Sequence, residues 1–512
     1  MAERKVAWKA RKDNSLIGSD ITRIDGVEKA SGHAKYAADI NTPGTLFARL
    51  LTFKGGAATV KTLDTADAEK TPGVRAVHVF NGVGKEVRWD GTIVAAVAAD
   101  TPEQAEDGVR AIKVTYEAKP HWVDEEDLGG ATAAKRTKPL GDNQKGEVAA
   151  ALKAAKHVHK GYYGIVTISH MCMEPHGSHC EWDGEDKLNV YLSTQNVSGT
   201  GGQFAGPLGL DASNVSITCD YIGGGFGSKF AVDQWGVACA QLSKKAGKPV
   251  RLMLDRATEM KIGGTRPSGF IEVTIAADAE GNITVWDSHH WGTSGIAGST
   301  ISLGQLPYCF DGIPNRNRKA TGISTNTGPN RAWRAPPHPQ LCAVTDTVID
   351  DLAAKMGANS YDIFMKNLDK TKKPDIYAAE MKIGAKLIDW KAKWHAHGKG
   401  DKGAVKRGLG MALHTWGGGA GGTKCTLKVH PDGSVETFLG SQDLGTGTRT
   451  VIAITLAETF GLGVEDVQVH LGNNSYPKAN PSGGSITVGG VSGPMRRAGL
   501  TALGQIYDLV AA

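Results

Sequence analysis

Cysteine is scarce and unpaired in this sequence, and long apolar runs are missing. The seven cysteines among 512 residues include no Cys-x-x-Cys pair, which argues against an iron–sulfur cluster or a zinc site held by this chain. The start, Met1 to Asp13, is polar, with neither an apolar signal core nor a twin arginine, and no later run is long enough to span a bilayer. These absences, with an odd number of mostly apolar-flanked thiols, favour a cytoplasmic protein without a membrane span.

A strong excess of charge and the common hydrolase motifs are also lacking. The net charge is +5, from 58 basic and 53 acidic residues, so nothing electrostatic points to nucleic acid or to a membrane surface. The sequence has no Gly-x-Ser-x-Gly elbow and no His-Glu-x-x-His zinc motif. If the chain is catalytic, we therefore expect a cofactor to carry the difficult chemistry.

Glycine, in contrast, is abundant: 67 of 512 residues, about 13% compared with a usual value of roughly 7%. Many glycines are clustered, which suggests close approach of the backbone to a large ligand and not a flexible linker. The clusters lie at 199–202, 223–227, 417–422, 483–484 and 489–490.

The most conspicuous cluster follows a predicted strand, Val215–Tyr221, and comes before an apolar stretch, 231–242, that predicts a buried helix. Strand, glycine loop and helix start together are typical of a site for an anionic ligand. The Walker A pattern fails because Lys229 is followed by phenylalanine, and the dinucleotide fingerprint fails because Ser228 stands at its third glycine. A tight turn that only packs is the alternative.

The rest of the chain predicts about three domains. Ile24 to Ala118 should form a compact α+β unit, with a buried strand at Thr92–Ala99 and a helix after the N-cap Thr101. Charged residues 119–148 indicate a connector.

Strands dominate from Val158 to about Asn367, with a helix at His338–Met356 that ends at Gly357. Lys370–Lys402 indicates a solvated connector, in which His395 and His397 are expected to be plain surface histidines.

A further unit begins near Arg407, with strands around 409–414 and 424–440. It contains a hairpin turn at Pro431–Gly433, a helix at Thr448–Phe460, a strand at Val467–Leu471 and a final helix from about Pro494 to Leu509.

Five loops place small residues and hydrogen-bond donors at the boundaries of predicted elements. Any one alone is better explained as a turn, but five in order favour a shared ligand. They contain Ser193-Thr194-Gln195, Gly223–Gly227, Asn330–Gln340, Asp443–Thr448 and Pro481–Ser485.

At these loops the sequence resembles the molybdopterin-binding large subunit of the molybdenum hydroxylases, the xanthine dehydrogenase and aldehyde oxidoreductase family. The resemblance covers nearly the whole chain but lacks the C-terminal part. Its motifs are Arg23–Gly26, Gly32–Ile40, Pro72–Val77, Val114–Glu117, Met173-Glu174-Pro175-His176, Ser193-Thr194-Gln195 and, most specifically, Gly224-Gly225-Phe226-Gly227-x-Lys229.

The resemblance implies an α+β fold with an N-terminal a/b hammerhead domain followed by mixed-sheet cofactor-binding domains, the last one incomplete. The implied boundaries are an arm at 1–20, the hammerhead domain at 21–120, a connector at 121–148, a first molybdopterin-binding domain at 149–385 and the N-terminal part of a second at 386–512.

The resemblance further implies a molybdopterin, in bacteria usually the cytosine dinucleotide, that carries molybdenum. Such a subunit hydroxylates an aldehyde or an N-heterocyclic carbon with oxygen from water, and electrons leave through iron–sulfur and flavin (FAD) partner subunits. Reductive chemistry on an aromatic thioester and a non-catalytic homologue or scaffold that has lost the cofactor stay open as alternatives.

The site residues implied by the resemblance bind the cofactor with backbone groups and neutral amides, which do not titrate. Gln195 should donate to an oxygen ligand of the metal, and Phe226, Phe230 and Arg334 should line the substrate pocket. A surface glutamine and a structural ion pair are the alternatives for Gln195 and Arg334. The implied cofactor-binding set is Gln195, Gly224, Gly225, Phe226, Gly227, Arg334, Ala335, Gly445, Thr446, Gly447, Ser482, Gly483 and Ser485.

The sequence also departs from the family pattern. Pro337 replaces a common glycine, Thr446 replaces a frequent glutamine, and Phe230 stands where purine-oxidising members often have glutamate. The loop at 331–334 has no cysteine, unlike the carbon monoxide dehydrogenase branch.

The family's base, a glutamate in a Gly-Glu-Pro-like motif, is missing: neither Gly146-Glu147 nor Gly184-Glu185 precedes proline. We expect no catalytic base in this chain and a second molybdopterin-domain chain that supplies it, with a truncated sequence or an inactive homologue as the alternatives.

Overall fold

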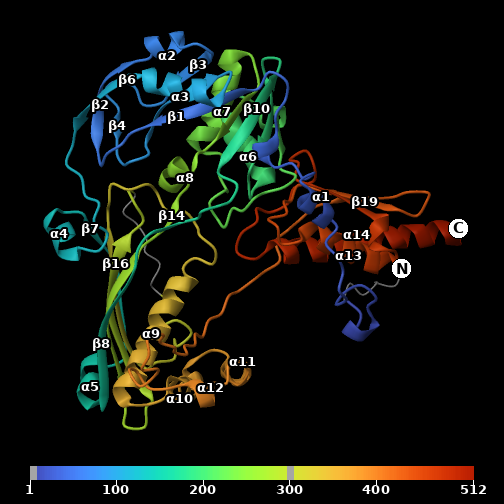
Figure 1. Ribbon diagram of the computed structural model, residues 1–512. Helices are drawn as coiled ribbons and strands as arrows, with labels where there is room; N and C mark the ends of the chain where they lie inside the picture. The colour runs from blue at the N-terminus through green and yellow to red at the C-terminus, as the bar shows by residue number, and fades with distance from the viewer. Residues whose placement is uncertain (1–7, 297–304) are drawn as a thin grey trace. The chain divides into compact units, whose positions relative to one another are not determined.

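The computed structural model describes residues 8–296 and 305–512. These form two compact units, each built from segments that are distant in sequence (Figure 1). Unit 1 comprises Met1–Lys119, His170–Gly263 and Gly417–Ala512, and unit 2 comprises Pro120–Ser169 and Gly264–Trp416. Both combine helices with mixed sheets, which confirms the α+β fold class. The predicted domain boundaries divide the chain in sequence order and stay a prediction.

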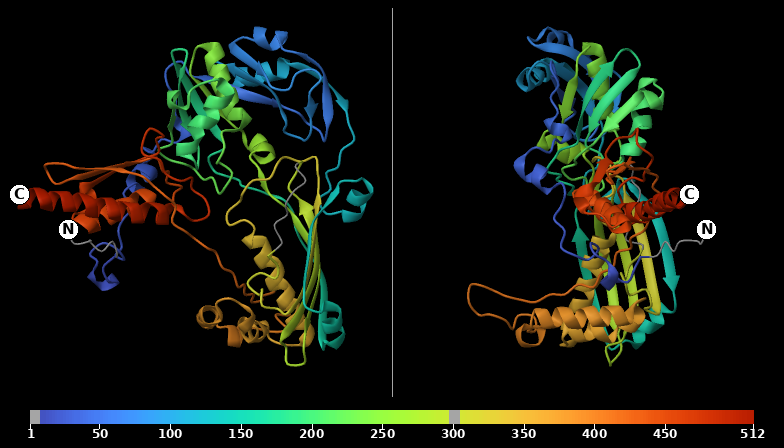
Figure 2. Two further views of the ribbon diagram at one scale, coloured as in Figure 1. Left: turned by 180° about the vertical axis from the view of Figure 1, so that it is seen from behind. Right: turned by 90° about the vertical axis from the view of Figure 1, so that its right-hand side faces the viewer.

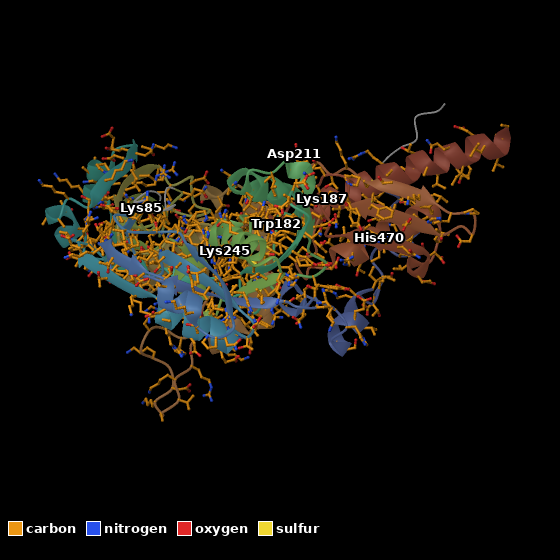
Figure 3. All side chains as sticks on the ribbon, turned by 90° about the horizontal axis from the view of Figure 1, so that it is seen from above. Lys85, Trp182, Lys187, Asp211, Lys245 and His470 are labelled. Atoms are coloured by element: carbon orange, nitrogen blue, oxygen red, sulfur yellow. The ribbon has the colours of Figure 1, made fainter. Side chains whose placement is uncertain are left out.

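Unit 1 is built on a seven-stranded mixed sheet, in the order β12-β11-β10-β13-β1-β5-β3. Every residue of β5 is buried, as its continuous apolar run predicts. Helix α7 (Asp233–Ala246) packs against β10, β13 and β3. Trp182, labelled in Figure 3, donates its indole N–H to the Ala240 carbonyl of that helix at 2.9 Å. The strands are β1 (Leu46–Thr52), β3 (Val74–Val79), β5 (Ile93–Ala99), β10 (Gly177–Asp183), β11 (Lys187–Leu192), β12 (Val215–Thr218) and β13 (Val250–Met253).

The N-terminal part of unit 1 also contains a small antiparallel sheet and two helices. The predicted cap is confirmed, because Thr101 Oγ1 accepts from the Gln104 N–H at 3.2 Å. The helix that follows Thr101 continues to Ala111. The elements are β2 (Ala58–Asp64), β4 (Glu86–Val87), β6 (Lys113–Ala118), α2 (Ala66–Lys70) and α3 (Pro102–Ala111).

Residues 417–512 contribute a three-stranded sheet and two helices that lie side by side (Figure 2). The helix at Thr448–Phe460, the strand at Val467–Leu471 and the hairpin at Pro431–Gly433 are confirmed. The predicted start of the final helix at Pro494 is wrong, because the helix begins at Thr487 and Pro494 lies inside it. The elements are β18 (Thr426–Val429), β19 (Val435–Leu439), β20 (Val467–Leu471), α13 (Thr448–Phe460) and α14 (Thr487–Ala511).

Unit 1 has further helices, of which α6 follows the segment at 193–196 and α7 follows the glycine loop at 223–227. They are α1 (Gly26–Ser31), α6 (Val197–Leu208), α7 (Asp233–Ala246) and α8 (Arg256–Ile262), with 3₁₀ turns at Arg11–Asp13, Ala37–Asp39, Ala212–Asn214 and Val464–Asp466.

Unit 2 contains a five-stranded sheet, in the order β7-β17-β16-β15-β8, with α9 (His338–Met356) along one face (Figure 1). Apolar side chains of α9, such as Val344, Val348 and Leu352, enter the core beneath it. The predicted end at Gly357 is confirmed by its left-handed backbone, φ 67°. The strands are β7 (Thr137–Lys145), β8 (His157–Ile165), β9 (Ile168–Ser169), β14 (Thr265–Arg266), β15 (Gly269–Ala277), β16 (Ile283–Thr293) and β17 (Asn315–Ile323).

The helices of unit 2 correct two readings of charged ranges as bare connectors. Residues 121–148 contain α4 and the edge strand β7, which is polar because most of its side chains are solvent-exposed. Residues 370–402 contain two helices, whereas 409–414 forms no strand. The helices are α4 (Leu128–Ala133), α5 (Val148–Ala154), α9 (His338–Met356), α10 (Ser360–Lys366), α11 (Pro374–Leu387) and α12 (Trp390–Lys393), with a 3₁₀ turn at Leu368–Lys370.

The described part of the N-terminal arm is fastened to α13. The backbone N–H groups of Ser15, Leu16 and Ile17 all donate to the Glu458 carboxylate, at 3.0, 2.7 and 3.3 Å. Among the helices of residues 8–296 and 305–512, none has the length and apolar character needed to cross a bilayer.

Candidate cofactor-binding site

The glycine loop of unit 1 is a strained turn with bare backbone. Gly224, Phe226 and Gly227 have φ values of +98°, +54° and +112°, and the Phe226 side chain is 42% exposed. The N–H groups of Gly224, Gly225 and Phe226 find no hydrogen-bond acceptor among the residues that the structure describes. Successive free donors of this kind suit an anionic group.

Gln195 joins this loop to a second one. Its Oε1 accepts from the Gly227 N–H at 2.8 Å and from the Lys229 N–H at 3.3 Å, while its Nε2 donates to the Ser482 carbonyl at 2.8 Å. Gln195 is 2% exposed, so it is not the surface glutamine of the alternative reading. One N–H of the amide has no acceptor in these contacts and is the one that could donate to a bound group.

Only glycine fits beside that amide. A Cβ on Gly225 would lie 2.5 Å from Gln195 Oε1, closer than real Cβ contacts allow. At this position the bare backbone packs against Gln195, whereas its predicted close approach to a large ligand stays a prediction.

The loop at 441–447 is tied to the same place by Gln442, which donates to Ser482 Oγ and accepts from the Val197 N–H. The next residue, Asp443, accepts from the N–H groups of Gly445 and Gly447 at 2.9 and 3.2 Å. Added Cβ atoms on these two glycines would meet nothing within 4 Å, so this backbone is open.

Arg23 secures the loop from the N-terminal segment. Its guanidinium donates to the Gly445 carbonyl at 2.7 Å and to the buried Asp25 carboxylate. Burial would raise the pKa of Asp25, but the hydrogen bonds from Arg23 and Lys29 outweigh it and lower the pKa well below its usual range.

The segment at 482–485 completes the group in unit 1. A Cβ on Gly483 would lie 2.7 Å from the Phe230 ring, so Phe230 packs against this backbone. Ser485 has φ +58°, and its carbonyl accepts from the Gly419 N–H at 3.4 Å. Unit 1 thus brings Gln195, the glycine loop and the loops at 445–447 and 482–485 into one network.

Arg334 and Ala335 belong to unit 2 and show backbone strain of their own, with φ values of +24° and +58°. Arg266, 1% exposed, holds this loop by donating to the carbonyls of Trp333 and Arg334 and by lying 4.5 Å from the Trp333 ring. Burial lowers the pKa of Arg266 to about 10. The Arg334 side chain itself is exposed.

Positive φ is concentrated at the predicted site. Among the described residues other than glycine, nine have it, and four of those nine are predicted site residues: Phe226, Arg334, Ala335 and Ser485. Such conformations cost about 1–3 kcal/mol each and persist where the surroundings enforce them, typically at functional sites.

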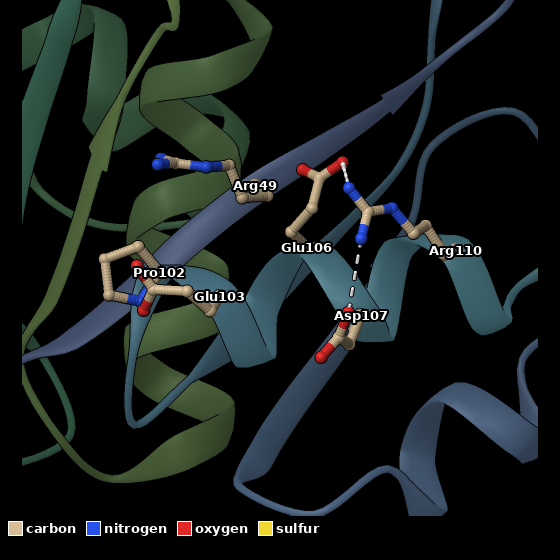
Figure 4. A pocket seen from close by; sticks show the side chains of 6 residues that line it. All are labelled: Arg49, Pro102, Glu103, Glu106, Asp107 and Arg110. Carbon is tan, nitrogen blue, oxygen red and sulfur yellow. Dashed lines mark hydrogen bonds and ion pairs between the residues drawn. The ribbon is translucent and has the colours of Figure 1, made fainter.

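Other clusters offer less. The hollow of Figure 4, about 300 Å³, is lined by Arg49, Pro102, Glu103, Glu106, Asp107 and Arg110. It is held by exposed pairs of Arg110 with Glu106 and Asp107 at 3.3 and 3.4 Å, which contribute little. Within the described residues, no group of three or more His, Cys, Asp or Glu side chains could hold a metal ion. His395 and His397 instead contact the Arg407 carbonyl and Asp350.

The sequence motifs include Glu174, His176 and Asp443 but predict no structural role for them, and Glu259 and Gln442 are outside the motifs; all five hold the loops of the site from below. A signal for Gln442 and Asp443 was present, because Ser441-Gln442-Asp443 follows a strand as Ser193-Thr194-Gln195 does. An anionic pterin fits a site that offers free N–H groups, open glycine backbone and a neutral amide. The carboxylates of this network accept hydrogen bonds from the protein itself.

Comparisons with known proteins show the family to which the chain belongs. Two family matches, both described as "Molybdopterin cofactor-binding domain", cover residues 132–368 and 384–511, well over half of the chain. The chain belongs to the family of molybdenum-binding large subunits of the xanthine dehydrogenases and aldehyde oxidoreductases, and the resemblance read from its motifs is confirmed.

Two relatives illustrate the similarity in sequence. The chain is 26% identical over 495 residues to the aldehyde oxidoreductase molybdenum-binding subunit PaoC of Escherichia coli (strain K12), covering 92% of this chain and 67% of that subunit. It is 28% identical over 386 residues to the nicotinate dehydrogenase large molybdopterin subunit of Eubacterium barkeri, covering 70% of this chain and 90% of that one.

Solved structures share the fold. The aldehyde oxidoreductase of Desulfovibrio gigas matches with a TM-score of 0.79 at 21% identity, over 94% of this chain and 59% of that one. Quinoline 2-oxidoreductase of Pseudomonas putida 86 matches with a TM-score of 0.76 at 19% identity, over 96% and 70%. The chain therefore spans about 60–70% of the length of these two proteins.

Proposed function

We propose that this chain is the cofactor-binding part of an enzyme that hydroxylates an aldehyde or an N-heterocycle with oxygen from water. The observation that carries the proposal is the network around Gln195, in which free backbone donors, open glycines and one spare amide N–H meet. The aldehyde, nicotinate and quinoline named in the relatives and structural matches support these substrate classes.

When bound, the molybdenum cofactor supplies oxygen-atom transfer and accepts the substrate's electrons. The chain's residues bind and orient it: Gln195 and the N–H groups of Gly224 to Phe226 at one place, and the open backbone of Gly445 to Gly447 and of Ser482 to Ser485 at others. These donors are neutral, so they hold negative charge without giving up a proton. Molybdopterin cytosine dinucleotide is the proposed form.

Phe226, Phe230 and Arg334 are proposed to shape the substrate pocket. Phe226 suits this role because the residue is 42% exposed on a loop whose backbone is held by hydrogen bonds to Gln195. Phe230 packs against Gly483 and would act as a wall.

The partners follow from the same proposal. Iron–sulfur and flavin subunits would take the electrons, and a second molybdopterin-domain chain would supply the catalytic glutamate. The Eubacterium barkeri relative supports the second chain, since its name describes a large molybdopterin subunit and this chain covers 90% of it. A cytoplasmic location is part of the proposal.

The test is metal and pterin analysis of the purified complex, with its intact mass. About one molybdenum and one pterin per complex, a second chain and dye reduction by aldehydes or N-heterocycles are expected. Arg334→Ala should lower turnover at least tenfold, whereas Arg110→Ala, at another exposed arginine, in the hollow of Figure 4, should leave it unchanged. Absence of molybdenum from complexes purified with their partners would point to a scaffold and refute the proposal.

A further inference from the structure

Two buried pairs of ionisable side chains contact the glycine loop, one at each end of it. Glu174, His176, Lys229 and Glu259 are each less than 8% exposed. Buried charge is costly and is seldom the most stable way to fill a core, so a pair at this position calls for a role beyond stability.

The first pair holds the start of the loop. Glu174 Oε2 accepts from the Gly223 N–H and from Ser193 Oγ, both at 2.7 Å, while the Glu174 N–H donates to the Gly223 carbonyl at 3.1 Å. Lys229 Nζ donates to Ser193 Oγ at 2.7 Å and to the Glu174 carbonyl at 2.8 Å, and lies 3.7 Å from Oε2. A Cβ on Gly223 would lie 2.4 Å from Glu174 Cβ, so the fit is close.

The second pair holds the end of the loop. The His176 ring lies between Glu259 Oε1, 2.8 Å from Nδ1, and the Ser228 carbonyl, 3.2 Å from Nε2. The His176 ring thus bridges the Glu259 carboxylate and the backbone at the end of the loop. Burial opposes ionisation of Glu259, but the hydrogen bond and charge of His176 outweigh it and lower the pKa of Glu259.

We infer that these two pairs are positioning residues that set the shape of the loop and thereby the direction of Phe226. They touch Gly223 and Ser228, on either side of Phe226, whereas Gln195 holds Gly227 from a third direction. A loop fixed at three points keeps its N–H groups and the Phe226 ring in place before any ligand binds. The consequence for catalysis rests on the proposed function; the consequence for the loop does not.

Hydrogen exchange of the full chain tests the inference, with the peptide at 222–230 as the readout. Glu174→Leu and Glu259→Leu should each speed exchange of this peptide at least tenfold, while β1 and β5 keep their rates. Glu174→Gln, which keeps an acceptor for Gly223, should restore most of the protection. Ser193→Ala, which removes only the bridging hydroxyl, gives a milder variant if the leucine substitutions do not fold.

Ser243→Ala is the matched control. Ser243 is 1% exposed and its hydroxyl donates to the carbonyls of Cys180 and Lys248, so the variant also loses buried hydrogen bonds, but at α7 and away from the loop. It should leave the 222–230 peptide unchanged. Unchanged exchange in the Glu174, Glu259 and Ser193 variants, or equal acceleration throughout unit 1, would overturn the inference.

A kinetic readout separates this result from the proposed function. In molybdenum-containing complexes, Ser193→Ala should raise the KM for a bulky aldehyde at least fivefold more than for a small one, with kcat for the small one within twofold. Equal changes in both KM values would contradict a role in aiming Phe226. If the complexes contain no molybdenum, the proposed function fails while the exchange result still decides the role of the pairs.

Discussion

The contact between Gly225 and Gln195 leads to a prediction that can be worked through from the structure. In Gly225→Ala the new Cβ would lie 2.5 Å from Gln195 Oε1. The amide cannot simply turn away, because its oxygen accepts from Gly227 and its nitrogen donates to the Ser482 carbonyl. Overpacking of this kind costs about 1–3 kcal/mol.

The assay is hydrogen exchange at the Gly227 and Lys229 amides, since both donate to the displaced oxygen. At about 1.4 kcal/mol for each factor of ten, the expected acceleration is roughly 5- to 150-fold. Gly202→Ala is the matched control: it lies in α6, a Cβ there would meet nothing within 4 Å, and the better helix former should stabilise slightly, by about 1 kcal/mol.

A double substitution tests the cause. In the Gln195→Ala background the oxygen is gone, so adding Gly225→Ala should change loop exchange by less than about twofold. Additive effects of the two substitutions, or unchanged protection of Gly227 in Gly225→Ala alone, would refute the steric reasoning.

Three further predictions concern other parts of the chain. Burial raises the pKa of Asp346 to about 7 from 3.8. The contribution of Asp346 to the free energy of unfolding is therefore largest below about pH 4, and up to about 4 kcal/mol of it is lost as the pH rises to about 7. In Asp346→Asn, thermal unfolding should no longer show this dependence on pH. Glu458→Leu leaves three N–H groups of the arm without their acceptor, so limited proteolysis near Ser15 should speed up at least tenfold, and unchanged cleavage would contradict the contact. Thr101→Ala removes the cap of α3 and should cost about 1 kcal/mol, seen as faster exchange of its first turn, whereas Thr101→Ser should not.

Much of the regular structure could be predicted because its signals are local. The helix at His338–Met356 and the strand at Val467–Leu471 were found to the residue, since apolar spacing and a glycine stop define them. The strand β7 and helix α11 were missed because solvent-facing elements carry the same charged residues as loops do. The start of the last helix was predicted wrongly at Pro494, because proline is common at the first position of a helix. Here α14 continues through Pro494.

In the candidate site, too, the local features could be predicted and the long-range contacts could not. Glycine clusters identified the loops, because a glycine in the sequence always means backbone without a side chain. The contacts that join them could not be read, since Gln195 and Ser482 lie 287 residues apart and Glu174 and Gly223 lie 49 apart, and only the tertiary fold brings such pairs together. Lys229 was noted as part of a motif, but its burial and its partners were not predictable.

The discontinuous make-up of unit 1 has a consequence for how the protein is made. Residues of unit 1 lie both before and after unit 2 in the sequence, so Gly417–Ala512 is synthesised only after all of unit 2. At about 5–20 residues per second, Gln195 waits roughly 15–60 s for Ser482 to be translated. The network around Gln195 can therefore close only after Ser482 has been made, and until then the glycine loop lacks one of the contacts that fix it.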